Sequence, residues 1–259
     1  MRDYEMSYVI FDLDQTLLND EEQVTDYTKA VLEALRGMGH KIVINTARSE
    51  MMTRALMERI EPDFTLLCAG AGILDRDGNY IYRREIPAAK TEAISRELVA
   101  RGKLFSVQGH PYIYTNNPTF KRFDVVQFSP ESFTYDFDAP KFIANLGVGA
   151  GSEAEYFATE YDIDVTRYFD GPLYRFCHKD ATKALGNAAL LSLTGGKPED
   201  VIAFGDDNGD LGMLLEAGVG VAMKNSLDEV KQKVSHITDY TNNEDGVARF
   251  LVKHFKLDM

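Results

Sequence analysis

The chain has 259 residues, of which 44% are hydrophobic, and a formal net charge of −13. We therefore expect one large or two modest globular domains and no nucleic acid or anionic membrane as a partner. No apolar run approaches the ~20 residues of a membrane span, the first residues lack a signal-peptide pattern, and Cys68 and Cys177 exclude a disulfide framework, so a cytoplasmic protein is expected.

The stretch around which the chain is organised lies near its start. Residues 8–11 form a continuous apolar run that leads directly into Asp12 and Asp14. Such a run predicts a strand buried on both faces, as a parallel sheet requires. Because open α/β folds place their ligands at the carboxyl edge of the sheet, we expect both carboxylates there. Two carboxylates on one side of a strand repel each other, which favours a bound divalent cation.

The next elements alternate between helix and strand. Strands are predicted at residues 41–45 and 64–68, with a helix between them that is stopped by Glu61-Pro62. An earlier helix is expected to begin after the N-cap Thr25 and to end at Gly37 and Gly39, with one apolar face formed by Tyr27, Val31, Leu35 and Met38. The order β-α-β-α-β predicts half of a doubly wound fold.

From about Glu85 to Asp180 the pattern becomes shorter and more aromatic. A hairpin turn at residues 75–78 precedes this region, and residues 116–139 cannot be assigned. The assigned elements are a helix at 89–100, antiparallel strands at 104–107 and 112–114 around Gly109-His110-Pro111, a helix opened by a capping box at 152–155, and strands at 163–168 and 173–177. We interpret the region as a small inserted α+β domain.

The alternating pattern returns at residue 181. A helix is predicted at 181–193, with Lys183 in its first turn, and strands are predicted at 201–204, 219–222 and 236–238. Three more helices are predicted: one at 213–217, one that begins with a capping box at 226–229, and one at 246–255. The fold class is therefore α/β, with a doubly wound, mostly parallel sheet. We predict a core of residues 1–84 and 181–259 and an α+β cap of residues 85–180.

The polar residues that could carry chemistry share one location. Each lies just after a buried strand or at the start of the next helix, and parallel strands bring such positions to one edge of the sheet. Acidic oxygens suit Mg²⁺, a hydroxyl and an ammonium suit a phosphate, and a carboxylate can be phosphorylated as a nucleophile. The residues concerned are Asp12, Asp14, Thr46, Lys183, Asp206 and Asp210.

Taken one at a time, these residues have structural interpretations as well. An isolated Asp pair can cap a turn, Thr46 can be an N-cap, Lys183 can be a solvated helix lysine, and Arg48 can pair with a surface acid. The Asp206 segment fails as a calcium loop, because such a loop would need Gly at Leu211 and Glu at Ala217.

As a set, the motifs resemble those of the haloacid dehalogenase superfamily of phosphatases. They are Asp12-Leu13-Asp14-Gln15-Thr16, Thr46-Ala47-Arg48, Lys183 and the loop from Gly205 to Asp210; residues 221–226 and 243–248 resemble further signatures of the Cof-type branch. Lys183 follows Thr46 by 137 positions (183 − 46), so the resemblance implies a cap inserted between the second and third motifs.

The resemblance also implies roles for these residues. Asp12 would attack phosphorus, and Asp14 would protonate the leaving alcohol and then activate water. Mg²⁺ would be held by Asp12, the main-chain carbonyl of Asp14 and Asp206. The other roles are phosphate binding by Thr46 and Lys183, with Asn225 at the edge of the site, and support by Asp210, Ala47 and Arg48.

Three positions depart from the family pattern. Gln15 and Ala47 stand where Gly is usual, and Gly209 stands where Asn is usual. None of these departures removes a charged catalytic group, so they bear on loop geometry rather than on the class of reaction.

We therefore predict a Mg²⁺-dependent phosphatase of small phosphorylated metabolites, monomeric or weakly homo-oligomeric, whose substrates are by resemblance sugar phosphates. Flavin mononucleotide and pyridoxal phosphate stay open as substrates. The alternatives are a phosphotransferase or phosphomutase that uses the same aspartyl phosphate, and a non-catalytic phosphometabolite-binding protein.

Overall fold

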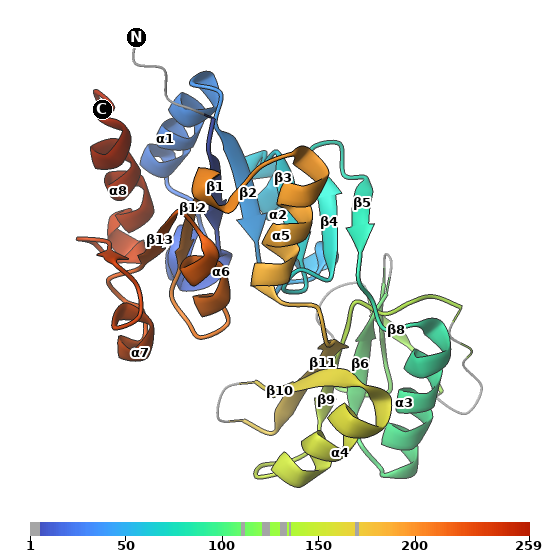
Figure 1. The fold of residues 1–259 in the computed structure, drawn as a ribbon. Helices are drawn as coiled ribbons and strands as arrows, with labels where there is room; N and C mark the ends of the chain where they lie inside the picture. Colours follow the sequence, from blue (N-terminus) through green and yellow to red (C-terminus); the bar gives the residue numbers. More distant parts are fainter. Residues whose placement is uncertain (1–5, 110–111, 121–124, 130–133, 135, 169–170) are drawn as a thin grey trace. The chain divides into compact units, whose positions relative to one another are not determined.

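The computed structural model describes residues 6–109, 112–120, 125–129, 134, 136–168 and 171–259. The chain divides into two compact units, drawn in Figure 1. The first contains residues 1–47, 54–82 and 182–259, and the second contains residues 48–53 and 83–181. The predicted core and cap boundaries lie within two residues of these, except that residues 48–53 group with the second unit. No helix among the described residues is long and apolar enough to cross a membrane.

The first unit is built on a mostly parallel sheet of eight strands in the order β14-β13-β12-β1-β2-β3-β4-β5. Every pair from β14 to β3 is parallel, and β4 is antiparallel to β3. This sheet confirms the predicted fold class. The strands are β1 (Tyr8–Phe11), β2 (Lys41–Asn45), β3 (Phe64–Leu67), β4 (Gly72–Asp75), β5 (Tyr80–Arg83), β12 (Val201–Gly205), β13 (Val219–Ala222) and β14 (His236–Ile237).

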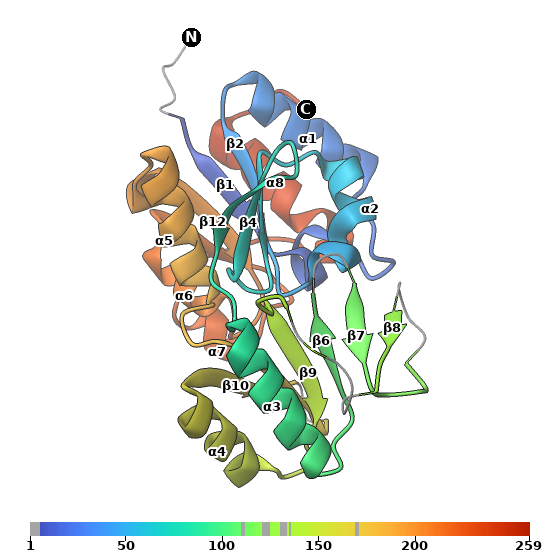
Figure 2. The same cartoon turned by 90° about the vertical axis from the view of Figure 1, so that its right-hand side faces the viewer.

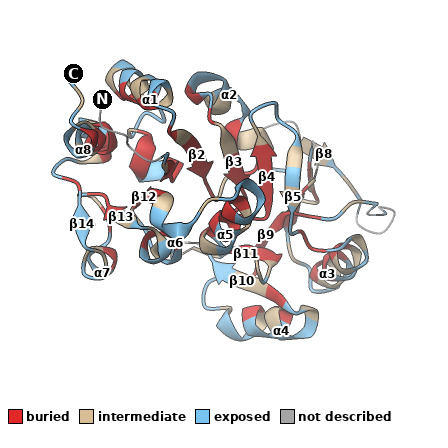
Figure 3. Cartoon of the chain, turned by 45° about the horizontal axis from the view of Figure 1, so that its top comes forward, coloured by how far each residue is buried: buried red, intermediate tan, exposed pale blue. Residues whose placement is uncertain are grey.

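Strand β1 is buried on both faces, as its unbroken apolar run predicts. Val9 and Phe11 pack into the hydrophobic cluster that α1 and α8 cover, whereas Tyr8 and Ile10 pack into the cluster that α5 and α6 cover. Figure 3 shows buried residues concentrated in the strands. The helices of this unit are α1 (Asp26–Gly37), α2 (Glu50–Ile60, of which residues 50–53 group with the second unit), α5 (Lys183–Thr194), α6 (Leu211–Glu216), α7 (Asp228–Lys231) and α8 (Gly246–Phe255).

Some helix ends match the predicted signals and others do not. The Thr25 hydroxyl accepts a hydrogen bond from the Thr28 N–H at 3.0 Å, which confirms the N-cap of α1. The two predicted capping boxes are wrong, because α4 (Gly151–Tyr161) and α7 begin after Ala150 and Leu227 without a side-chain cap. The Ser226 hydroxyl instead donates to the Gly205 carbonyl at 3.2 Å.

The second unit is built on a six-stranded sheet in the order β10-β11-β9-β6-β7-β8. All its pairs are antiparallel except β7–β8, and α3 (Ala88–Ala100) and α4 contribute to the apolar cluster on one face (Figure 2). The strands are β6 (Phe105–Gln108), β7 (Ile113–Thr115), β8 (Val125–Gln127), β9 (Lys141–Asn145), β10 (Ile163–Arg167) and β11 (Leu173–His178).

Two strands of the second unit were not predicted from the sequence. Strand β8 lies within residues 116–139, to which the sequence pattern assigns no element. Strand β9, which lies between β11 and β6 in the sheet, is also absent from the predicted elements. Strand β8 has only three residues, and β9 pairs only with strands that lie about 30 or more positions away in sequence, so local periodicity carries little information about them. In the predicted turn at 109–111, His110 and Pro111 lie outside the described residues.

Candidate active site

The acidic residues that follow β1 and β12 converge at the carboxyl edge of the parallel sheet. The two strands pair directly, with Phe11 opposite Phe204, and the Asp12 N–H donates to the Phe204 carbonyl at 3.0 Å. The structure brings one carboxylate oxygen from each of Asp12, Asp206 and Asp210 within 4.8 Å of one another. Residues from opposite ends of the chain therefore form one acidic cluster.

Lys183 joins two members of this cluster. Its Nζ lies 2.6 Å from Asp12 Oδ1 and 2.5 Å from Asp210 Oδ1, and all three residues are buried. Burial alone would lower the pKa of the Lys183 ammonium, but attraction to Asp12 and Asp210 outweighs it and holds the pKa above its ordinary value. The lysine is therefore a fixed positive charge beside Asp12.

Asp210 uses both of its oxygens inside the protein. Oδ1 faces Lys183, and Oδ2 accepts the backbone N–H groups of Asp206 and Asp207 at 3.0 and 3.1 Å. Gly205 makes this packing possible, because a Cβ at that position would lie 2.4 Å from Asp210 Cβ. Asp210 thus positions the loop that carries Asp206.

The remaining carboxylates, Asp12 and Asp206, suit a divalent cation. Burial raises the pKa of Asp12 well above its ordinary value, and burial followed by repulsion from Asp210 and Asp207 raises the pKa of Asp206 to about 7. One ammonium faces three carboxylates in this cluster, so an additional positive charge among their oxygens would be favourable. Hard oxygen donors are the ligands that Mg²⁺ prefers, and the residues present fit such an ion.

Asp14 lies in a turn, Leu13–Leu17, that follows Asp12, and the dihedral angles of Asp14 and Gln15 are not helical. The turn closes through hydrogen bonds from the Leu17 N–H to the Asp12 carbonyl and from the Leu18 N–H to the Leu13 carbonyl, at 3.3 and 2.9 Å. Asp14 is exposed, and Gln15 adopts a φ of 58°. The turn is therefore made with a left-handed residue at the position where the family pattern has Gly.

Thr46 is fully buried just after β2, where its N–H donates to the Leu66 carbonyl at 3.0 Å and its carbonyl accepts from the Ala69 N–H at 2.8 Å. Ala47 and Arg48 follow it and are half-buried, and Arg48 belongs to the second unit. At the departure Gly209, the N–H donates to Asp207 Oδ1 at 2.8 Å, so an Asx turn closes this loop without an Asn at that position.

Two residues of the site were missed from the sequence. The Asn45 amide donates to the Lys183 carbonyl at 2.9 Å and to Asn187 Oδ1 at 2.8 Å, which ties the first turn of α5 to the end of β2. The Thr16 hydroxyl donates to Asp206 Oδ1 at 3.0 Å. A polar residue at the end of a buried strand was the available signal for Asn45.

The predicted phosphate ligand Asn225 has its described contacts elsewhere. Its amide donates to the Gln15 carbonyl at 2.7 Å, and its oxygen accepts from the Asn242 N–H at 3.0 Å. Both ends of this side chain therefore hold backbone beside the site rather than a carboxylate of the cluster.

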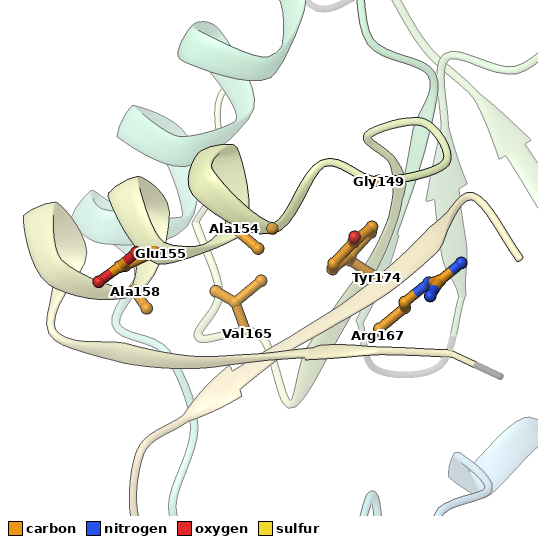
Figure 4. A pocket seen from close by; sticks show the side chains of 8 residues that line it. Gly149, Ala154, Glu155, Ala158, Val165, Arg167 and Tyr174 are labelled. Carbon is orange, nitrogen blue, oxygen red and sulfur yellow. The ribbon is translucent and has the colours of Figure 1, made fainter. Parts of the chain in front are cut away.

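A concavity lies within the second unit and is a poor candidate for this chemistry. It has a volume of about 510 Å³ and is lined by α4 and the Gly-rich segment before it, together with β10 and β11 (Figure 4). Glu155 and Arg167 supply its charged groups, and none of the predicted site residues lines it.

Comparisons with known proteins identify the family of the chain. A family model described as haloacid dehalogenase-like hydrolase matches residues 9–251. The 5-amino-6-(5-phospho-D-ribitylamino)uracil phosphatase YcsE of Bacillus subtilis is 29% identical over 98% of this chain and 98% of its own length. A putative phosphatase of Haemophilus influenzae is 31% identical over 95% of this chain and 97% of its own length.

Solved structures show the same fold. A haloacid dehalogenase-like hydrolase from Bacteroides thetaiotaomicron superposes with a TM-score of 0.86 at 23% identity, covering 97% of this chain and all of that one. The family model and the relatives confirm the family resemblance and the hydrolase class, and the solved structure confirms the α/β fold.

Proposed function

This chain belongs to the haloacid dehalogenase-like hydrolase family, and we propose that it is a Mg²⁺-dependent phosphatase of small phosphorylated metabolites that forms an aspartyl phosphate on Asp12. The observation that carries the proposal is the buried Asp12 carboxylate, which lies beside Lys183 and within one acidic cluster with Asp206. This arrangement provides a nucleophile, a cation for the phosphoryl oxygens and oxygen ligands for a metal.

The proposed reaction has two steps. An Asp12 carboxylate oxygen attacks phosphorus, the bond from phosphorus to the alcohol oxygen breaks, and Asp14 gives its proton to that oxygen. Water, deprotonated by Asp14, then attacks the phosphoaspartate and releases inorganic phosphate, which restores Asp12. Lys183 and Thr46 bind phosphoryl oxygens throughout. Asp12, the Asp14 carbonyl and Asp206 would hold a dication, which would supply positive charge for the oxygens of the transferring group.

We propose phosphate monoesters of sugars or sugar alcohols as the substrate class. The support comes from relatives aligned over nearly the full chain, since YcsE and YitU of Bacillus subtilis, 29% and 26% identical, carry the name of a phosphatase of a phosphoribitylamino compound. A screen of phosphorylated metabolites that ranks kcat/KM tests this assignment.

The nucleophile is tested with Asp12→Asn. We expect hydrolysis of p-nitrophenyl phosphate to fall by roughly 10³-fold or more, since a neutral amide cannot form the acyl phosphate. Circular dichroism should show the fold retained. Asp228→Asn, an exposed carboxylate on α7 paired with Lys231, is the matched control and should keep wild-type turnover. Unchanged turnover of Asp12→Asn would refute the assignment.

Two further measurements complete the test. Chelation should remove activity and Mg²⁺ should restore it, whereas full activity of the chelated enzyme would contradict the role of the cation. Adding a sugar acceptor separates hydrolysis from transfer: phosphate recovered on the acceptor instead of in solution would identify a phosphotransferase. Absence of turnover on every substrate would favour the non-catalytic alternative.

A further inference from the structure

Five side chains outside the acidic cluster fasten the loop after β1 to the C-terminal part of the first unit. We name this group the loop clamp; it consists of Gln15, Asp20, Asn225, Asn242 and Asn243. Asn225 binds backbone with both ends of its amide, donating to the Gln15 carbonyl at 2.7 Å and accepting from the Asn242 N–H at 3.0 Å.

The other members of the loop clamp hold the end of the same loop. Asn242 donates to the Leu18 carbonyl at 3.0 Å and to Asp20 Oδ1 at 3.2 Å. Asn243 donates to Asp20 Oδ2 at 2.8 Å and accepts from the Asp20 N–H at 2.9 Å. The Gln15 amide also donates to Asp20 Oδ1 at 3.2 Å. Donation from Asn243, Asn242 and Gln15 lowers the pKa of Asp20, so this anion stays charged at neutral pH.

The clamped segment needs such support for a physical reason. Gln15 holds a φ of 58°, a conformation that side-chain-bearing residues adopt at a cost and that surrounding contacts must maintain. The next residue, Thr16, donates to Asp206 Oδ1 at 3.0 Å. Asp14 therefore lies between Asp12, which belongs to the acidic cluster, and Gln15, whose carbonyl is held by the loop clamp.

We propose that the loop clamp positions Asp14 for proton transfer to the leaving alcohol, an inference that rests on the proposed phosphatase function. Its members touch no reacting atom in this mechanism and act through the backbone of the Asp14 turn. Misplacing a general acid slows a step only where that step needs a proton. The loop clamp therefore matters most for substrates with basic leaving groups.

The test removes one donor of the loop clamp and keeps its acceptor. Asn225→Asp still accepts from the Asn242 N–H but presents an oxygen to the Gln15 carbonyl. We expect kcat/KM for an alkyl phosphate to fall at least about tenfold and that for p-nitrophenyl phosphate less than threefold, because nitrophenolate leaves without protonation. Asn243 is exposed, so we expect Asn243→Ala to lower kcat/KM for the alkyl phosphate and for p-nitrophenyl phosphate by smaller factors than Asn225→Asp does.

Asn116→Asp is the matched control. Asn116 joins two backbone groups in the same way, donating to the Lys103 carbonyl at 3.0 Å and accepting from the Phe105 N–H at 2.8 Å, but it lies in the second unit. Its substitution should change kcat/KM for both substrates by the same factor. Equal losses for both substrates in Asn225→Asp would overturn the proposal.

Amide hydrogen exchange separates this inference from the proposed function. A peptide covering residues 12–18 should exchange faster in Asn225→Asp and Asn243→Ala than in wild type, and at the wild-type rate in Asn116→Asp. Unchanged exchange in both loop-clamp variants refutes the loop clamp, whatever the activity. Faster exchange in an enzyme without any phosphatase activity supports the loop clamp as a holder of this turn and refutes the proposed function.

Discussion

At the scale of single residues, the site depends on a buried ion triplet that is costly to break. Asp12, Lys183 and Asp210 have relative exposures of 6%, 5% and 0%. Removing one partner from a buried ion pair leaves an uncompensated charge, which typically costs about 3–5 kcal/mol. The same contacts that orient Asp12 therefore also contribute to the stability of the sheet edge.

His40 is a second buried polar residue, and it should make stability depend on pH. Its Nδ1 accepts the Ser7 N–H at 3.2 Å, its Nε2 has no hydrogen-bond partner among the described residues, and its ring lies 4.5 Å from that of Phe255. Burial, followed by repulsion from His254, lowers the pKa of His40.

The sign of the effect follows from proton binding. A histidine with a lower pKa when folded binds fewer protons in the folded state, so stability falls as pH drops through 6.5 and levels off below the folded pKa. A tenfold difference in proton affinity between the folded and unfolded states corresponds to about 1.4 kcal/mol. We predict that urea unfolding between pH 7.5 and 5 has a smaller pH slope in His40→Asn, which keeps an acceptor for Ser7. Equal slopes would contradict the assignment.

At the scale of elements, α5 is placed by a contact between two glycines. A Cβ on Gly186 would lie 2.7 Å from Gly70 Cα, and a Cβ on Gly70, at a φ of 93°, would lie 2.4 Å from the Thr182 carbonyl oxygen. The close approach brings the first turn of α5, and with it Lys183, against the loop after β3. The absence of side chains at these positions is therefore part of the site.

We predict that Gly186→Ala displaces α5 and lowers stability by about 1–3 kcal/mol, the usual cost of overpacking. Activity should fall as well, because Lys183 moves relative to Asp12. Gly37→Ala is the matched control: Gly37 is also helical, and an added Cβ meets nothing within 4 Å. It should be neutral or stabilising by up to about 1 kcal/mol. Urea unfolding and p-nitrophenyl phosphate hydrolysis measure both effects; equal stability of the two variants would contradict the packing argument.

Helices α1 and α5 could be predicted because each combines a periodic apolar pattern with a clear end signal, whereas the short strand β4 was not predicted. Thr25 and Gly39 bound α1, and Thr182 and Gly195 bound α5 in this way. The short strands β8 and β9 have neither property. Ser226 shows a different limit, since its capping pattern was present but its hydroxyl binds the Gly205 carbonyl instead.

Some residues of the site could be predicted from the sequence, and others could not. The meeting of Asp12, Lys183, Asp206 and Asp210 could be anticipated, because all four follow buried strands or open a helix at one edge of the sheet. The hydrogen-bond partners of Asn45 and of the loop clamp could not be anticipated, since amide hydrogen bonds between distant segments leave no characteristic spacing, although the position of Asn45 at the end of a buried strand was a signal. Such contacts are visible only when the folded backbone determines which carbonyls and N–H groups lie within reach.

At the scale of the whole molecule, the net charge of −13 opposes the approach of an anionic phosphate ester. Salt screens such repulsion, with a Debye length of ~30 Å at 0.01 M and ~8 Å at 0.15 M ionic strength. At saturating Mg²⁺ we predict that kcat/KM for a dianionic substrate rises about twofold or more between these conditions, while kcat changes little. If kcat/KM instead decreased as the salt concentration rose, local positive charge at the site would control association of the substrate.

The central strand has a further consequence for how the protein is made. Strand β1 pairs with β2 on one side and with β12 on the other. During translation β2 emerges soon after β1, whereas β12 emerges only after the whole second unit. An apolar strand with one unpaired edge can recruit another chain. We therefore expect truncated products that end before Val201, which leave one edge of β1 unpaired, to aggregate more readily than the full chain.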